Sequence, residues 1–434
     1  MKKKYLRLSS LAAICLGGLF FFSCSNDDGT PFTVAPEKPV IPVESSDLKL
    51  SGEYATDRSQ SIAIIPNLEK FNSPKVTWKV IGFNNIAKDS VVSNDNDLYF
   101  VTLKEGRYNL IVQVQDDHNQ ITHSFDIKIE KEKEAYKNHI FKIYDFLPSY
   151  GQFTNKLPKY EEGDTKEIMI EKAEKAIAVP KPSMISLGGF GGYVVFGFDH
   201  TIVNVPGKRD FRVLGNAFWA NANPNAGASG RGGSCEPGVI MVAYDKNGNG
   251  VPDEDEWYEI AGSEHSKPKT VKNYEITFYR PEANKEPVKD PALTWATDLE
   301  YMRWEDNQGN KGYKPKNTFH HQSYFPEWIK DDKITFKGTL LPNNAIDESG
   351  QGNYWVLYSF DYGYADNAPN KDDESAIDIS WAVDKNGKKV HLPGIDFIKV
   401  YTGLNQEAGW LGETSTEVSG AIDLHLEGTS IPTR

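Results

Sequence analysis

The chain has 434 residues, of which 39% are hydrophobic and 12% aromatic, so it can fill the cores of two or three domains. Its formal net charge is −13 at pH 7. A surface of that sign repels phosphate backbones, and the sequence after the leader contains no basic cluster that would reverse the repulsion locally. We therefore expect no nucleic-acid partner.

The N-terminus has the features of a lipoprotein leader. The basic start MKKKYLR precedes LSSLAAICLGGLFFF, an apolar run too short for a lasting membrane span. The run ends in FFSC, which resembles a bacterial lipobox. That resemblance implies a signal peptide over residues 1–23 and lipidation of Cys24. The following SNDDGT resembles the surface-export signal of Bacteroidetes-type lipoproteins, which implies an outer-membrane location facing the cell exterior, with membrane contact through the lipid anchor alone.

Residues 24–46 are rich in Pro, Ser and acidic residues without a core-forming period, which predicts a tether. The chain contains three cysteines. Cys15 leaves with the leader and Cys24 carries lipid, so Cys235 has no partner for an intramolecular disulfide and is expected to be a small buried residue.

Residues 47–131 are predicted to form a small β domain. Short strand-like runs such as KVTWKVIG and YNLIVQVQD are separated by Asn, Asp and Gly, and the second alternates apolar and polar residues. The stretch GRYNLIVQVQDDHNQITHSFDIKI resembles the last hairpin of PKD-like or Ig-like modules, with Trp78 as a core residue. Such modules usually act as spacers.

Residues 132–182 are predicted to be a linker that contains one helix within TKEIMIEKAEKAI. Residues 183–434 contain many strand-like runs and no long amphipathic helix between them, which favours a large jelly-roll-like β-sandwich. The predicted fold class is therefore all-β: an Ig/PKD-like sandwich followed by a larger one.

The segment DKNGNGVPDEDE, residues 245–256, matches an EF-hand calcium loop at every fixed position. The predicted ligands are side-chain oxygens and one carbonyl oxygen, from Asp245, Asn247, Asn249, Val251 (carbonyl), Asp253 and Glu256. The alternative is a polar turn, which is the better interpretation of the related DKNGK at 384–388. We predict a structural Ca²⁺ site that ties down a long loop. A second acidic stretch, YADNAPNKDDES, has no ligand spacing and is expected to be a solvated loop.

The large domain resembles a family of bacterial cell-surface β-sandwich proteins with the pattern SLGGxG…GxDFxVxxN…GExSTE. The matching residues are Ser186–Gly189, Gly191, Phe198, Asp199, Ile202, Gly207, Asp210, Phe211, Val213, Asn216, Glu236, Pro237, Gly412, Glu413 and Ser415–Glu417; Thr414 departs from the usual sequence. The resemblance implies a fold and a surface location. Similar lipoproteins accompany nutrient-uptake systems, including those for corrinoids, so an outer-membrane transporter is an expected partner.

Two sets of residues are candidates for ligand binding. The acids Asp210, Glu236, Glu413 and Glu417 stand beside strand ends, where they would form a second cation or ligand site or else serve as caps and surface charge. Trp219 and Trp410 stand beside loop signals. An aromatic ring beside a few oriented polar groups is how proteins hold sugars or flat macrocycles.

No nucleophile–base motif or metalloprotease motif is present, and no pair of acids is singled out for glycosidase chemistry. We therefore predict a non-catalytic, calcium-stabilised surface lipoprotein that captures a nutrient, either a glycan or a corrinoid such as cobalamin. The alternatives are a glycan-active hydrolase and a structural adhesin or subunit of an outer-membrane complex. The sequence leaves the ligand, the oligomeric state and the convergence of the acids open.

Overall fold

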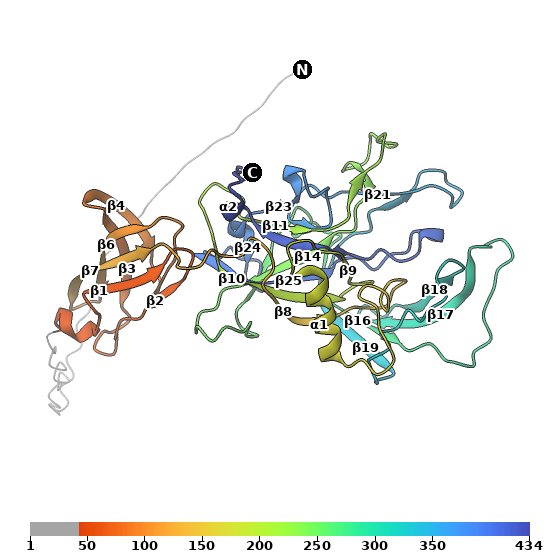
Figure 1. Ribbon diagram of the computed structural model, residues 1–434, viewed down its shortest axis with the longest axis horizontal. Coiled ribbons are helices and arrows are strands. Elements are labelled where there is room, and N and C mark those ends of the chain that lie inside the picture. The colour runs from red at the N-terminus through yellow and green to blue at the C-terminus, as the bar shows by residue number, and fades with distance from the viewer. Residues whose placement is uncertain (1–42) are drawn as a thin grey trace, which may run out of the picture. The chain divides into compact units, whose positions relative to one another are not determined.

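The computed structural model describes residues 43–434 (Figure 1). The signal peptide, Cys24 and the tether up to residue 42 lie outside the described residues. The regular secondary structure of the described part is almost entirely β, arranged in several sheets, so the predicted all-β sandwich class is confirmed. Its N-terminal portion and its larger C-terminal portion each have a hydrophobic core of their own.

The N-terminal portion begins with a short 3-10 helix, η1 (Ser45–Leu48), and contains a five-stranded and a two-stranded sheet. The strands are β1 (Glu53–Asp57), β2 (Ile62–Ile64), β3 (Lys75–Phe83), β4 (Ile86–Ser93), β5 (Leu98–Phe100), β6 (Gly106–Gln115) and β7 (Gln120–Glu130). The order in the larger sheet is β1-β7-β6-β3-β4, and β2 pairs with β5. Alternate residues of β6 are buried, as the pattern predicts. Trp78 is fully buried, and its Nε1 donates a hydrogen bond to the carbonyl of Asp95 at 2.9 Å.

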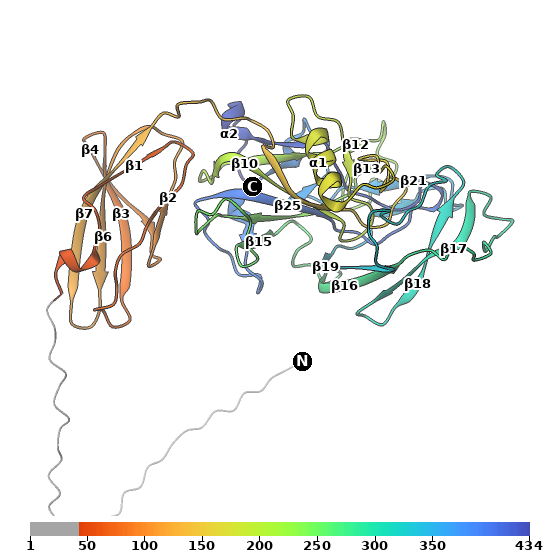
Figure 2. The ribbon, with the colours of Figure 1, turned by 60° about the horizontal axis from the view of Figure 1, so that its bottom comes forward.

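A seven-stranded sheet, hereafter the main sheet, forms the centre of the C-terminal portion (Figure 2). Its strands are β8 (Lys142–Leu147), β10 (Tyr193–Val203), β25 (Gly394–Thr402), β14 (Gly238–Ala243), β15 (Trp257–Ile260), β24 (Ala382–Val383) and β22 (Tyr364–Ala365). All pairings are antiparallel. Strands β10, β14 and β25 are buried along nearly their whole length, because other elements cover both of their faces.

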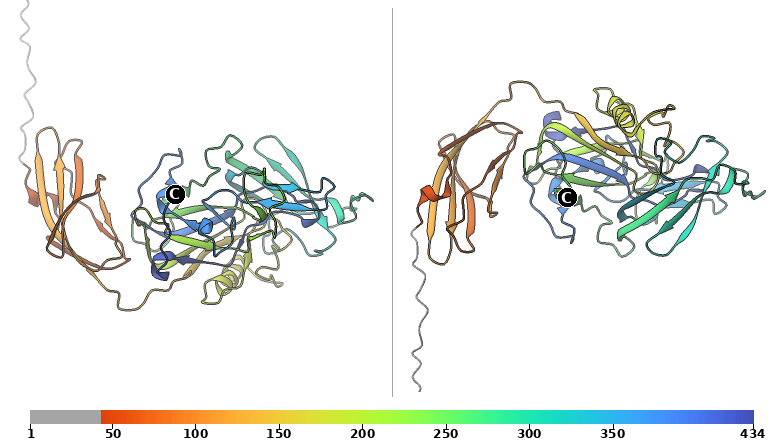
Figure 3. Two further views of the ribbon diagram at one scale, coloured as in Figure 1. Left: turned by 90° about the horizontal axis from the view of Figure 1, so that it is seen from above. Right: turned by 90° about the horizontal axis from the view of Figure 1, so that it is seen from below.

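Smaller antiparallel sheets surround the main sheet. The largest has the order β18-β17-β16-β19, and its strands appear in green to cyan beside the main sheet in Figure 3. Its members are β16 (Val271–Tyr279), β17 (Ala296–Asp306), β18 (Lys311–Asn317) and β19 (Lys333–Leu340). One further sheet contains β11 (Phe211–Leu214), β23 (Ala376–Ile377) and β27 (Gly420–Asp423). A second contains β12 (Phe218–Trp219), β13 (Gly232–Ser234), β21 (Trp355–Tyr358) and β20 (Ala345–Asp347). A third pairs β9 (Ile185–Ser186) with β26 (Glu417–Val418). Short helical turns complete the portion: η2 (Asp373–Ser375), η3 (Ile379–Trp381), η4 (Gly409–Leu411) and α2 (Leu424–Glu427).

The predicted helix is present as α1 (Lys166–Ile177). Its N-terminus is capped by Thr165, whose side chain accepts a hydrogen bond from Ile168 N. Met169, Ala173 and Ile177 pack into the core of the main sheet. The segment is more than a linker, however, because β8 forms an edge strand of that sheet against β10. The short run KIYDFL carries too weak an alternation to reveal this long-range pairing.

The glycine-rich segment ahead of β10 permits a close backbone approach. A Cβ atom on Gly192 would lie 1.8 Å from the carbonyl oxygen of Leu187 and 2.3 Å from the amide nitrogen of Ser149. Those two atoms form a 2.8 Å hydrogen bond with each other. Only glycine fits at this position.

Candidate functional site

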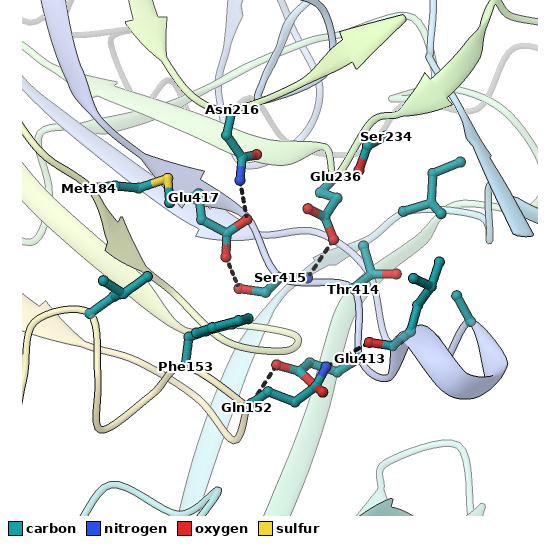
Figure 4. Close-up of a pocket in the computed structure, with 14 residues that line it drawn as sticks. Gln152, Phe153, Met184, Asn216, Ser234, Glu236, Glu413, Thr414, Ser415 and Glu417 are labelled. Atoms are coloured by element: carbon teal, nitrogen blue, oxygen red, sulfur yellow. Dashed lines mark hydrogen bonds between the residues drawn. The ribbon is translucent and has the colours of Figure 1, made fainter. Parts of the chain in front are cut away.

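A cavity of about 250 Å³, lined by both apolar and polar side chains, lies where segments from distant parts of the chain meet. It is lined by Gln152, Phe153, Leu157, Met184, Asn216, Ser234, Glu236, Leu357, Ala408, Leu411, Glu413, Thr414, Ser415 and Glu417. In Figure 4 the carboxyl groups of three glutamates are seen with amide and hydroxyl groups around this space. We call it the acidic cavity. Its wall offers both hydrogen-bond donors and acceptors.

Two of these glutamates belong to a cluster of three carboxyl groups. Glu236 lies between β13 and β14, Asp366 follows β22, and Glu417 begins β26. One carboxylate oxygen from each residue lies within 4.8 Å of the other two. Three pieces of chain far apart in sequence therefore supply one acidic centre.

Asp366 was missed by the sequence analysis, which treated YADNAPNKDDES as a solvated loop. That expectation is wrong for the first part of the stretch, because Asp366 is only 3% exposed. Its Oδ1 accepts hydrogen bonds from the amides of Asn216 and Ala217, both at 2.8 Å, and its Oδ2 accepts one from Glu417 N at 3.1 Å. No local spacing signals this role, since the donors lie about 50 and 150 residues away.

Glu417 and Glu236 are connected through Ser415. The Ser415 hydroxyl donates to Glu417 Oε1 at 2.8 Å, and Ser415 N donates to Glu236 Oε1 at 3.3 Å (Figure 4). Glu417 Oε2 accepts a longer bond from Asn216 Nδ2, at 3.4 Å. These contacts hold the carboxyl groups in place at the cavity wall.

Burial raises the pKa of all three carboxyl groups. The pKa of Asp366 rises to about 8, first through burial and then through the negative charge of Glu417. Burial is also the main cause of the raised pKa values of Glu236 and Glu417. At neutral pH the cluster must therefore keep protons or balance its charge with a cation. A retained proton turns a carboxyl group into a hydrogen-bond donor.

Glu413 forms another part of the cavity wall. Its Oε1 accepts a 2.6 Å hydrogen bond from Gln152 N, and burial followed by the charge of Glu407 raises its pKa to about 8. Glu407 itself accepts a hydrogen bond from the Tyr150 hydroxyl at 2.8 Å and lies 3.4 Å from Lys314 Nζ. The charge of Glu407 is thus paired, whereas no cation among residues 43–434 forms an ion pair with Glu413.

Trp410 stands beside the acidic cavity. It occupies η4 together with Leu411, which lines the cavity, and its side chain remains 39% exposed. The ring of Phe319, which is also exposed, lies 6.5 Å away in an edge-on arrangement. The two rings offer an aromatic surface next to polar groups.

Two of the sequence candidates lie outside the acidic cavity. The indole nitrogen of Trp219 donates to the carboxylate of Asp372, and the guanidinium of Arg231 lies 4.8 Å from the Trp219 ring. Asp210 is fully buried and accepts hydrogen bonds at 2.9 Å from Val205 N and Ile379 N. Its carboxylate therefore holds loops together, so it does not join the other three acids.

The predicted calcium loop connects β14 and β15. The Asp245 carboxylate accepts hydrogen bonds from the amides of Asn249, at 3.1 Å, and Gly250, at 2.8 Å. The side-chain amides of Asn247 and Asn249 each donate to Asp253 Oδ2 at 2.7 Å. Glu256 is buried at the end of the loop, and Val251 is exposed. The oxygen-bearing side chains are near one another, but both amides would have to turn their oxygen atoms inward to bind a cation.

The related segment at 384–388 forms a turn, as predicted. Asp384 N donates to Lys388 O at 2.9 Å, and Gly387 N donates to Asp384 O at 2.8 Å. Cys235 is buried and free, in agreement with its expected structural role. None of the helices within residues 43–434 is long and apolar enough to cross a membrane.

No protein-family model and no curated protein matches the sequence. Among solved structures, the PKD domain of human KIAA0319 matches with 10% identity and a TM-score of 0.17, covering 20% of this chain and 84% of that chain. A quinoprotein alcohol dehydrogenase-like protein of Bacteroides thetaiotaomicron matches with 14% identity and a TM-score of 0.15, covering 40% and 35%. A SusE-like protein matches with 7% identity and a TM-score of 0.19, covering 89% and 98%. Similarities at these scores carry no inference about function.

Proposed function

We propose that the protein is a lipid-anchored protein of the outer cell surface that binds a glycan without cleaving it. The observation that carries this proposal is the acidic cavity with Trp410 at its side. Sugars present hydroxyl groups around an apolar ring face, and such ligands are held by oriented polar groups beside an aromatic surface. The cavity wall and Trp410 supply this combination.

The size of the cavity favours a sugar over a corrinoid. About 250 Å³ is below the ~300–1,000 Å³ that is typical of sites for drug-sized ligands. A single sugar unit at the end of a chain would enter such a space, with the next unit resting against Trp410. A corrin macrocycle is much larger and would not be enclosed.

The arrangement of the acids favours binding over hydrolysis. A retaining glycosidase separates its two carboxyl groups by ~5–5.5 Å, and an inverting enzyme by ~6.5–9.5 Å. In the cluster of Glu236, Asp366 and Glu417, protein groups already occupy several of the acceptor positions that a reacting sugar and water would need. Hydrolysis remains the second candidate because Glu413 lines the same cavity.

The proposal is tested by thermal unfolding of the full chain with a panel of neutral oligosaccharides and with cyanocobalamin. A ligand at 100 times its dissociation constant should add about 2.7 kcal/mol to the free energy of unfolding. We expect stabilisation by at least one oligosaccharide and none by cyanocobalamin. Stabilisation by the corrinoid alone, or release of reducing sugar over time, would contradict the proposal. No stabilisation by any compound would favour an adhesin.

Replacement of Trp410 tests the aromatic surface directly. Trp410→Ala should weaken glycan binding roughly fivefold, because stacking on an exposed ring contributes on the order of 1 kcal/mol. Phe218→Ala is the matched control, since Phe218 is 59% exposed and lies outside the cavity. Isothermal titration calorimetry with the stabilising oligosaccharide gives the affinities. Equal losses in both variants would argue against the assigned site.

We further propose that the loop at 245–256 binds Ca²⁺ and that the protein works beside an outer-membrane transporter. The calcium proposal is supported by the match in spacing and by the clustered side chains of Asp245, Asn247, Asn249 and Asp253. Burial, and then the charges of Asp245 and Asp253, raise the pKa of Glu256, and a bound cation would relieve that repulsion. The transporter proposal rests on the sequence resemblance alone.

A further inference from the structure

A second cavity, of about 780 Å³, lies between the main sheet and the β16–β19 sheet. We call it the lysine cavity. Its size is within the ~300–1,000 Å³ of typical small-ligand sites, and it shares no lining residue with the acidic cavity. It is lined by residues of β10, β14, β15, β16, β19 and β25 and by the turn at 384–387.

The lysine cavity carries an excess of basic side chains, although the chain as a whole is acidic. Four lysines line it, namely Lys272, Lys337, Lys385 and Lys399, against the two acids Glu259 and Asp384. The charge of Glu259 is already balanced, because its Oε1 lies 2.9 Å from Lys272 Nζ and its Oε2 accepts the hydroxyl of Thr339 at 2.7 Å. An excess of positive charge therefore remains available to a ligand.

Lys399 contributes a positive charge to this cavity that no carboxylate of the described residues pairs with. It extends from β25, and its Nζ lies 4.2 Å from the ring centroid of Tyr193. Asp145 is the acid whose negative charge raises the pKa of Lys399. Its carboxylate is already bound by Lys166 Nζ at 2.8 Å and by the Tyr193 hydroxyl at 2.7 Å. Burial lowers the pKa of Lys399, so an anion placed beside its ammonium group would restore the stability of the charged form.

Aromatic groups accompany this lysine. Tyr193, Trp257 and Tyr401 line the same cavity, and the first two are half-buried. Tyr401 is only 3% exposed, so a ligand that fits places an apolar face against Tyr193 or Trp257 and an anionic group beside Lys399.

We propose that the lysine cavity is a second ligand site that binds a saccharide carrying a carboxylate, with Lys399 as the residue that recognises the carboxylate. This site goes beyond the proposed function, because it lies apart from the acidic cavity and takes an anionic ligand where the acidic cavity takes a neutral one. The two sites together would let one protein hold a mixed neutral and acidic glycan.

Binding of digalacturonic acid to the full chain tests this proposal, with the uncharged methyl ester of the same disaccharide as the matched ligand. We expect calorimetry to detect the acid and to show at least roughly tenfold weaker binding of the ester, because a charge-assisted hydrogen bond to Lys399 is lost. Lys399→Gln should weaken binding of the acid by a similar factor and leave the affinity for the ester unchanged.

Two further variants keep the test decisive. Lys399→Arg retains the charge and should keep most of the affinity, and Lys330→Gln, an exposed lysine outside the cavity, should bind as the unmodified protein does. Unchanged affinity in Lys399→Gln, or equal affinity for acid and ester, would overturn the proposal. So would absence of binding at about 10 mM ligand, or equal competition by acetate, which would indicate adventitious anion binding. None of these results bears on Trp410 and the acidic cavity.

Discussion

Glu413 and Asp366 are two residues whose protonation should affect stability. The pKa of each is raised to about 8, in both cases mainly by burial. A carboxyl group with a raised pKa binds its proton more tightly in the folded protein than in the unfolded chain. Its contribution to stability is therefore greatest below the ordinary pKa near 4, falls as pH rises to about 8, and is constant above that.

We predict that the free energy of unfolding falls by a few kcal/mol between about pH 5 and pH 9, as measured by urea denaturation. Glu413→Gln should reduce this fall, because glutamine can still accept the hydrogen bond from Gln152 N but does not ionise. Glu162→Gln, at an exposed position, should leave the pH dependence unchanged. An unaltered dependence in Glu413→Gln would show that Glu413 is already ionised at pH 5.

At the scale of structural elements, two short glycine-containing segments set the geometry around the main sheet. The segment before β10 brings Gly192 against the hydrogen bond between Ser149 and Leu187. The loop between β14 and β15 carries the side chains proposed to bind calcium. A substitution in the first segment and removal of calcium from the second test these two roles separately.

Gly192→Ala should destabilise the protein by about 2 kcal/mol or more, because the added methyl group would collide with backbone atoms that cannot move aside cheaply. Gly227→Ala is the matched control, since its Cβ atom would meet only Asn225 Oδ1, at 3.4 Å. The measurement is the midpoint of thermal unfolding for both variants. A small effect at Gly192 would mean that the β9–β10 connection can rearrange.

Removal of calcium should lower the thermal midpoint of the unmodified protein, and Asp245→Ala should abolish the difference between calcium and chelator. Asp384→Ala provides the control: it removes the equivalent aspartate of the DKNGK turn and should leave the calcium response intact. If chelation has no effect on the unmodified protein, residues 245–256 form only a turn.

At the scale of the whole molecule, the proposed function depends on where the protein is held. Cys24→Ala should prevent lipid attachment and release the protein from the membrane fraction into the soluble fraction. Fractionation of cells followed by immunoblotting measures this. Protease added to intact cells should degrade the unmodified protein if it faces the exterior, and survival of the protein would instead place it on the inner side of the outer membrane.

Local patterns in the sequence determined much of the element structure. The alternation in YNLIVQVQD places Leu110, Val112 and Val114 in the core of the N-terminal portion, because a strand turns successive side chains to opposite faces. The spacing in TKEIMIEKAEKAI likewise predicts α1. Each of these signals lies within a dozen residues, so neighbours along the chain suffice to read it.

The acidic cavity was decided by the tertiary structure. Glu236 and Glu417 stood out beside strand ends, but Asp210 looked the same in sequence and is bound elsewhere, while Asp366 was hidden in an acidic stretch. Their convergence depends on the pairing of β14 with β22 and β25 and of β9 with β26, which joins segments up to about 230 residues apart. The burial of these carboxyl groups and their closeness to one another arise only from that strand pairing. The sequence alone therefore determined which residues could ionise, and the fold decided which of them keep their protons.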